Sequence, residues 1–134
     1  DTSERDSLFQ AEARRCLDIL KTIKKENDKK HFCIFDELYS GTNPNDAIYC
    51  ANIYLKGLNT FKKRVDYVLT THYIKLCEEI EETESDNISN LKMDCNESLD
   101  EIEFLYKIKK GISNIHGGKY ILKQLEYPEY LFKI

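Results

Sequence analysis

The chain has 134 residues, of which 41% are hydrophobic and 33% charged, a balance that supports one folded domain and excludes a disordered tail. Its net charge of -4 does not favour nucleic acid contact over the whole surface. No apolar run approaches the ~20 residues that span a membrane, and the polar start lacks both Met and a signal-peptide pattern. We therefore expect a fragment of an intracellular protein, cytoplasmic or nuclear and not secreted, with no membrane partner.

The five cysteines, at positions 16, 33, 50, 77 and 95, form no C-x-x-C pair of the kind that zinc sites use. Their number is odd and several lie in apolar stretches, which favours free, mostly buried thiols.

Residues 6–26 predict a first helix, because apolar side chains recur there at steps of three and four residues. Asp6 or Ser7 is the expected N-cap. After a polar loop, residues 31–35 are apolar without alternation, which is typical of a strand buried on both faces.

A turn-rich stretch over residues 39–45 leads into the second predicted helix, in which Pro44 takes the first position and Asn43 caps it. This helix is expected to extend to about residue 62. A second strand is predicted over residues 65–71, and a third helix follows it, with Tyr73, Cys77 and Ile80 on one face.

Two further strands are predicted over residues 88–94 and 103–108, as a pair. A loop begins at Gly111, and a last helix covers residues 118–126. Strands that alternate with amphipathic helices indicate the α/β class, with a mainly parallel sheet, flanking helices and a C-terminal strand pair.

Both strong strand candidates end in polar residues, the first in Asp36 and Glu37, the second in Thr70, Thr71 and His72. Ligands bind beyond the carboxyl ends of strands in open α/β sheets, so neighbouring strands bring these groups to one edge. Transfer of a phosphoryl group to water needs carboxylate oxygens for Mg²⁺, a base for the water and a donor to the γ-phosphate. We predict that Asp36 serves the metal, Glu37 the water and His72 the phosphate.

Four segments in one order resemble the ATPase domain of the MutS family. FCIFDELYSGTNPNDA, at 32–47, resembles its Walker B strand and D-loop, and TTHY, at 70–73, resembles its H-loop. SLFQAE, at 7–12, is similar to its signature segment, and FLYKIKKG, at 104–111, with Pro128 17 residues later, to its C-terminal strand, loop and helix. The resemblance covers nearly the whole chain and is carried by the four motifs together.

The resemblance implies that residues 1–134 form the C-terminal part of an ABC-type P-loop NTPase domain that uses ATP and Mg²⁺. Asp36 is then the residue for water-coordinated Mg²⁺, Glu37 the general base and His72 the γ-phosphate sensor. Ser7 is expected to contact nucleotide bound in the opposite subunit, through its hydroxyl and the helix N-terminus. The D-loop at the dimer interface comprises Ser40, Gly41, Thr42 and Asn43. The implied partners are a second MutS-like subunit, identical or different, and DNA contacted by other parts of the parent protein.

The chain also departs from the family pattern. Tyr39 and Ser40 stand where members usually show Gly and Arg, Asn43-Pro44 replaces Ser-Thr, and His116-Gly117-Gly118 replaces Ser-Tyr-Gly. The chain holds no G-x-x-x-x-G-K-[ST] phosphate-binding loop. In the family that loop lies upstream of the signature segment, so we expect it before Asp1. These departures indicate a divergent branch.

Three functions compete at this point. The first is an ATPase, active in the full-length parent and inactive as this fragment, that couples hydrolysis to DNA binding in mismatch repair or a related DNA transaction. The alternative is a catalytically inactive dimerisation module of a MutS-like protein. The third is an unrelated doubly wound domain in which the Asp-Glu pair and the histidine are accidental.

Overall fold

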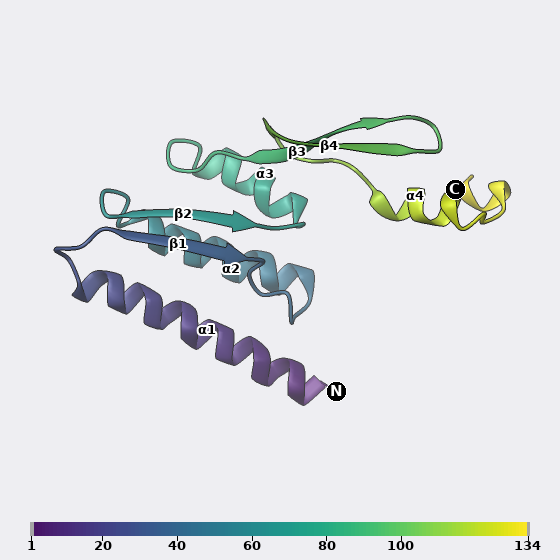
Figure 1. Ribbon diagram of the computed structural model, residues 1–134. Coiled ribbons are helices and arrows are strands. Elements are labelled where there is room, and N and C mark those ends of the chain that lie inside the picture. Colours follow the sequence, from purple (N-terminus) through teal and green to yellow (C-terminus); the bar gives the residue numbers. More distant parts are fainter. Residues whose placement is uncertain (1, 134) are drawn as a thin grey trace. The chain divides into compact units, whose positions relative to one another are not determined.

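Two structural units make up the chain in the computed structural model, which describes the backbone of residues 2–133 and the side chains of residues 7–133 (Figure 1). The contacts divide it into Asp1–Ile88 and Ser89–Ile134. We call these unit 1 and unit 2 and describe each by itself.

Unit 1 alternates helices and strands in the order α1 (Thr2–Lys25), β1 (His31–Asp36), α2 (Pro44–Asn59), β2 (Val65–Thr70) and α3 (Ile74–Thr83). The two strands pair in parallel, in a register that places His31 opposite Val65 and Asp36 opposite Thr70. The α/β class and the parallel pairing of these strands are therefore confirmed.

Helix α1 begins at Thr2, earlier than the sequence pattern predicted. Residues 2–6 contain neither glycine nor proline, so nothing in their sequence interrupts the helix. The predicted N-cap at Asp6 or Ser7 is wrong, because both residues lie inside the helix. At the other end, Nη1 of Arg64 donates to the carbonyl of Ile23 over 2.8 Å, which satisfies one of the last carbonyls of α1.

The start of helix α2 agrees with the prediction. Oδ1 of Asn43 accepts a hydrogen bond of 2.9 Å from the N–H of Asp46, and Pro44 lies in the first turn. The helix ends at Asn59, earlier than the predicted residue 62, and the hydroxyl of Thr60 donates to the carbonyl of Gly57 over 2.6 Å.

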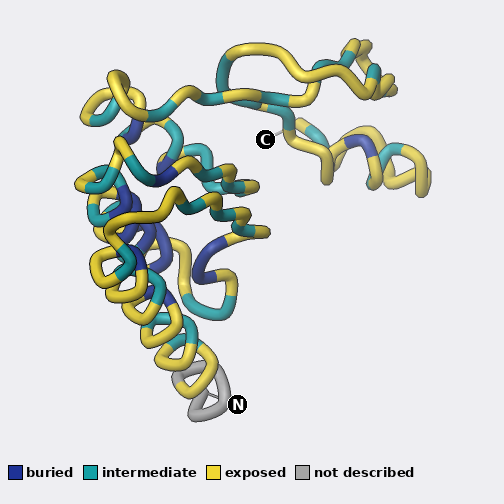
Figure 2. The backbone as a smooth tube through the Cα atoms, turned by 60° about the vertical axis from the view of Figure 1, so that its left-hand side comes forward, coloured by how far each residue is buried: buried dark blue, intermediate teal, exposed yellow. Residues whose placement is uncertain are grey.

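The core of unit 1 forms where its three helices pack on one face of the strand pair, and Figure 2 shows the buried positions gathered there. Leu55 and Leu58 of α2 are 2% and 0% exposed. Burial of a leucine side chain contributes about 1.5–3 kcal/mol. The other large side chains that are fully buried come from α1 and α3, namely Ile23 and Leu76.

The predicted burial of β1 on both faces is wrong within the described residues. Its positions alternate, and Cys33 and Phe35 pack against the core while Phe32 and Ile34 are 66% and 72% exposed. Val68 of β2 is also exposed, at 53%. The uninterrupted apolar run supplies two hydrophobic faces, and the helices of this unit cover one of them.

Unit 2 contains an antiparallel pair, β3 (Leu91–Glu97) and β4 (Ile102–Lys110), followed by α4 (Gly117–Gln124) and a short 3₁₀ helix, η1 (Glu129–Phe132). The C-terminal strand pair and the last helix are confirmed, with β3 starting three residues later than predicted. The ladder shifts register between Met93 and Cys95, and Tyr106, in the opposite strand, has a φ of 55°. Such a bulge increases the local twist of the pair.

Helix α4 is followed, after its cap residue Leu125, by the left-handed residue Glu126, with a φ of 62°. The N–H of Glu126 donates to the carbonyl of Lys123 over 3.0 Å, and that of Tyr127 to the carbonyl of Leu122 over 3.1 Å. This is the Schellman arrangement, in which glycine is the usual left-handed residue. Tyr120 of α4 is buried, and its hydroxyl donates to Oε2 of Glu97.

All five cysteines are free, and Cys16 is the one that is fully buried. Burial raises the pKa of the Cys16 thiol, which keeps it protonated and unreactive. Within residues 2–133, none of the helices combines the length and the apolar character that crossing a membrane requires.

Candidate active site

The carboxyl ends of β1 and β2 meet at one edge of the parallel pair, where Asp36 is the register partner of Thr70. Oγ1 of Thr70 donates a hydrogen bond of 2.8 Å to Oδ1 of Asp36. The backbone N–H of Glu37 donates to the carbonyl oxygen of Thr70 over 3.0 Å and also lies 3.2 Å from its hydroxyl oxygen. These bonds fix the end of one strand against the end of the other.

Glu37 and His72 extend this contact into a connected group. Nδ1 of His72 lies 3.2 Å from Oε1 of Glu37, and their side chains are 64% and 44% exposed. The structure therefore brings together Asp36, Glu37 and His72, as parallel strand ends predict. We call these three residues and Thr70 the edge network.

Glu37 adopts a left-handed backbone conformation, with a φ of 59°. This conformation costs a non-glycine residue about 1–2 kcal/mol. The two contacts of its N–H with Thr70 help to hold the strained turn. Such outliers concentrate at active sites, where the strain orients a reacting group.

The oxygen donors at this edge suit a hard cation. Mg²⁺ keeps several waters and binds proteins through one or two carboxylates together with substrate phosphates. The Asp36 carboxylate, with the Thr70 hydroxyl beside it, fits that requirement. Among the described residues, no group of three or more His, Cys, Asp or Glu side chains could hold a metal ion. A site at Asp36 would thus depend on water and phosphate oxygens as further ligands.

The remaining predicted site residues lie apart from the edge network. Ser40, Gly41, Thr42 and Asn43 form the turn between β1 and α2. Leu8 of α1 lies beside this turn, because a Cβ built on Gly41 would be 3.9 Å from that of Leu8. Ser7 is exposed on α1, five residues after its first residue, so the prediction that it stands at the helix N-terminus is wrong.

Sequence reasoning did not predict the contacts of three residues. These are the hydrogen bond between Glu12 and Tyr39 and the bond from Thr70 to Asp36. The N–H of Tyr39 lies 2.6 Å and 3.0 Å from the two carboxylate oxygens of Glu12. The spacing of Phe9, Glu12 and Cys16, at steps of three and four residues on one helix face, was the available signal.

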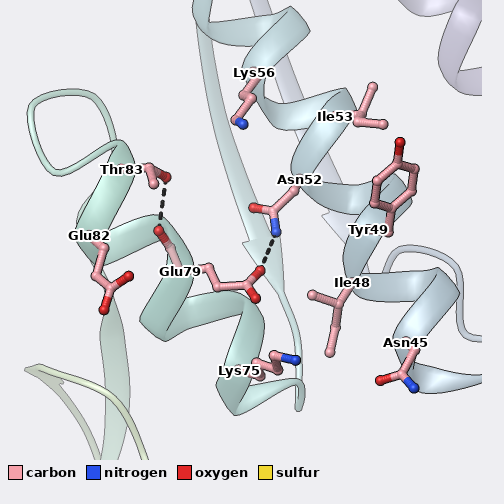
Figure 3. A pocket seen from close by; sticks show the side chains of 10 residues that line it. All are labelled: Asn45, Ile48, Tyr49, Asn52, Ile53, Lys56, Lys75, Glu79, Glu82 and Thr83. Carbon is pink, nitrogen blue, oxygen red and sulfur yellow. Dashed lines mark hydrogen bonds between the residues drawn. The ribbon is translucent and has the colours of Figure 1, made fainter.

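A groove of about 550 Å³ lies elsewhere in unit 1, between α2 and α3 (Figure 3). Nδ2 of Asn52 donates to Oε2 of Glu79 over 2.6 Å in this groove, beside the exposed side chains of Tyr49 and Ile53. The lining of this groove includes no residue of the edge network, so it adds nothing to the candidate chemistry.

Comparison with known proteins identifies the family of the chain. The family model of MutS domain V matches residues 1–133. The chain is 30% identical over 117 residues to the DNA mismatch repair protein MutS of Persephonella marina, which covers 85% of this chain and 13% of that protein. It is 28% identical over 130 residues to the DNA mismatch repair protein MutS of Finegoldia magna, covering 96% of this chain and 15% of that protein.

A differently named relative matches at similar identity. The endonuclease MutS2 of Clostridium kluyveri is 29% identical over 111 residues, covering 83% of this chain and 13% of that protein. The chain thus spans 13% to 15% of the length of these relatives.

Proposed function

Because the chain belongs to the MutS domain V family, we propose that it is the C-terminal part of an ABC-type P-loop ATPase domain. The protein that contains it binds and hydrolyses ATP with Mg²⁺. The observation that carries this proposal is the edge network, in which two carboxylates, a hydroxyl and an imidazole are hydrogen-bonded at the carboxyl ends of parallel strands.

Each residue of the network has a separate part in the proposed reaction. Asp36 would hold Mg²⁺ through water, and the bound ion would supply positive charge to the phosphates of ATP. Glu37 accepts a proton from the attacking water, and its strained backbone fixes the direction of the carboxylate.

His72 donates a hydrogen bond to the γ-phosphate in the proposed reaction. When Nδ1 donates to the ionised Glu37, Nε2 can donate to a phosphate oxygen only if the ring carries both protons. The imidazolium form is therefore the one that contacts Glu37 and phosphate at the same time.

The partners proposed for the parent protein are assigned from predicted site residues outside the edge network. Ser7 and the D-loop residues Ser40, Gly41, Thr42 and Asn43 form the contact with a second MutS-like subunit and its nucleotide. Ser7 acts there through its hydroxyl. The parent acts inside the cell, in mismatch repair or a related DNA transaction, with DNA bound by its other parts. The names of the relatives, a mismatch repair protein and an endonuclease, support a DNA transaction of this kind.

The first experiment compares steady-state ATP hydrolysis by the full-length protein and by its Glu37→Gln variant. Loss of a general base is expected to lower turnover by about 10²- to 10⁴-fold, while ATP binding is retained. Glutamine keeps the size of the side chain, so the change isolates the loss of the base.

A matched control is Glu82→Gln, which changes an exposed glutamate of α3 in the α2–α3 groove and should leave turnover unchanged. If the parent hydrolyses no ATP, or Glu37→Gln turns over like wild type, the site is not catalytic. The chain is then a dimerisation module, and its self-association becomes the property to measure.

A further inference from the structure

Tyr39 is the second strained residue after β1, with a φ of 60°. It stands two residues after Glu37 and directly before the turn of residues 40–43. Its side chain is 5% exposed, although residues of connecting segments usually lie at the surface. Something other than local backbone preference therefore holds this residue.

Helix α1 holds Tyr39 through three residues on one of its faces. The carboxylate of Glu12 accepts the backbone N–H of Tyr39, with both oxygens within 3.0 Å. The Phe9 and Tyr39 rings pack at 5.5 Å between centroids. The hydroxyl of Tyr39 donates to the sulfur of Cys16, and burial raises the pKa of that hydroxyl well above its ordinary range. We call these four residues the clasp.

Glu12 makes the one contact in the clasp that acts on the backbone. A surface glutamate on a helix is usually solvated, yet both of its carboxylate oxygens here face a single N–H. A carboxylate acceptor makes a hydrogen bond roughly twice as strong as a neutral one. The ring contact and the thiol contact position only the side chain of Tyr39.

We propose that Glu12 is a positioning residue, which holds the left-handed backbone at Tyr39 and so sets the direction of the Glu37 carboxylate and of the turn that follows. The effect on the backbone is independent of activity, whereas the effect on turnover rests on the ATPase function proposed above.

The test uses the full-length protein with Glu12→Ala, Glu12→Gln and, as the matched control, Asp18→Ala, which removes an exposed carboxylate from the same helix. Amide hydrogen exchange and steady-state ATP kinetics are measured on each. In Glu12→Ala, exchange at the Tyr39 amide should rise by about 10- to 100-fold, as expected for loss of a hydrogen bond to a charged group. Exchange in β1 and β2 should not change.

The turnover of the Glu12 variants shows whether Glu12 positions the catalytic group or only stabilises the fold. Glu12→Ala should lower kcat by about 10- to 100-fold, the size of effect that misplacement of a catalytic group produces, and should change KM for ATP by less than about twofold. Glu12→Gln retains one oxygen acceptor and should recover most of both the protection and kcat. Asp18→Ala should match wild type in both measurements.

Two results overturn the inference: unchanged exchange at Tyr39 in Glu12→Ala, or a uniform rise across unit 1 that marks Glu12 as a general stabiliser. Normal kcat in Glu12→Ala, with Tyr39 deprotected, overturns the coupling to the edge network. If Glu37→Gln itself leaves hydrolysis unchanged, the ATPase proposal fails, while the exchange measurement still decides whether Glu12 holds the turn.

Discussion

Units 1 and 2 are stabilised in different ways. Every buried hydrophobic side chain among the described residues except Tyr120 lies in unit 1, where the helices pack on the β1–β2 pair. Unit 2 has a regular strand ladder but leaves Tyr106 and Ile108 largely exposed, and its helix is attached through Tyr120 and Lys123. The comparison shows that unit 1 is stabilised by a core, while unit 2 depends on backbone pairing and a few polar contacts, although each unit holds two left-handed non-glycine residues.

The largest expected difference concerns leucines. Leu58→Ala in unit 1 should lower the free energy of unfolding by about 2–5 kcal/mol, because the site is closed on all sides and a cavity remains. Leu99→Ala in unit 2 removes a side chain that is 78% exposed and should change it by less than about 0.5 kcal/mol. Urea unfolding followed by amide signals of each unit measures both. Equal losses of unfolding free energy in the two variants would contradict the proposed difference between units 1 and 2.

Strained residues give the second contrast, since Tyr39 and Glu126 have nearly the same φ. Tyr39→Gly relieves about 1–2 kcal/mol of strain but loses a buried aromatic side chain, for a net loss of about 2 kcal/mol. Glu126→Gly should raise the free energy of unfolding by about 1 kcal/mol, because the exposed glutamate has little packing to lose. Thermal unfolding of both variants tests whether stability falls in Tyr39→Gly and rises in Glu126→Gly. A loss of stability in Glu126→Gly would contradict the view that the glutamate is strained there.

Two tyrosines of unit 1, the partly buried Tyr67 and the buried Tyr54, sharpen the comparison within this unit. The hydroxyl of Tyr67 donates to Oδ1 of Asn59 over 2.8 Å, so Tyr67→Phe should cost about 1 kcal/mol. The hydroxyl of Tyr54 is buried and, among the described residues, has no hydrogen-bond partner. Tyr54→Phe should therefore be neutral or stabilising by up to about 1 kcal/mol. Denaturant midpoints of the two variants measure both changes. A clear loss of stability in Tyr54→Phe would mean that the Tyr54 hydroxyl has a hydrogen-bond partner after all.

The smallest expected effect is confined to alkaline pH. The hydrogen bond to Glu97, together with burial, raises the pKa of Tyr120 to about 12 from its ordinary value of 10. Because the folded-state pKa is the higher one, the stabilising contribution is complete below pH 10 and is lost as the pH rises through 12. Amide protection in β3 should fall over this range in wild type but not in Tyr120→Phe. Tyr130→Phe, at an exposed position, should titrate like wild type.

Sequence reasoning predicted the order of the elements because apolar periodicity follows directly from burial. It also predicted that Asp36, Glu37 and His72 meet, since parallel strands end at the same edge. It could not predict the bonds from Thr70, because these depend on a register that places Thr70 opposite Asp36.

Sequence reasoning could not predict the contacts of the clasp or the first residue of α1, for related reasons. A tyrosine at a φ of 60° contradicts local preference, and its backbone N–H contacts Glu12 on a helix, 27 residues earlier in the chain. The position of Ser7 was misjudged because a capping residue type was taken as a boundary, although the residues before it are compatible with a helix. Both errors arise where tertiary contacts or neighbouring residues override a local signal.

The parallel pairing of β1 and β2 also has a consequence for the rate at which the chain folds. Partners in this pair are 34 residues apart (31 to 65), whereas the last rung of the β3–β4 hairpin joins residues only 5 apart (97 to 102). Hairpins form in about 1–10 μs, but a parallel pair must first close a loop that contains a whole helix. During synthesis, β1 therefore leaves the ribosome as an apolar strand without its partner, and it pairs only after residue 70 has been made.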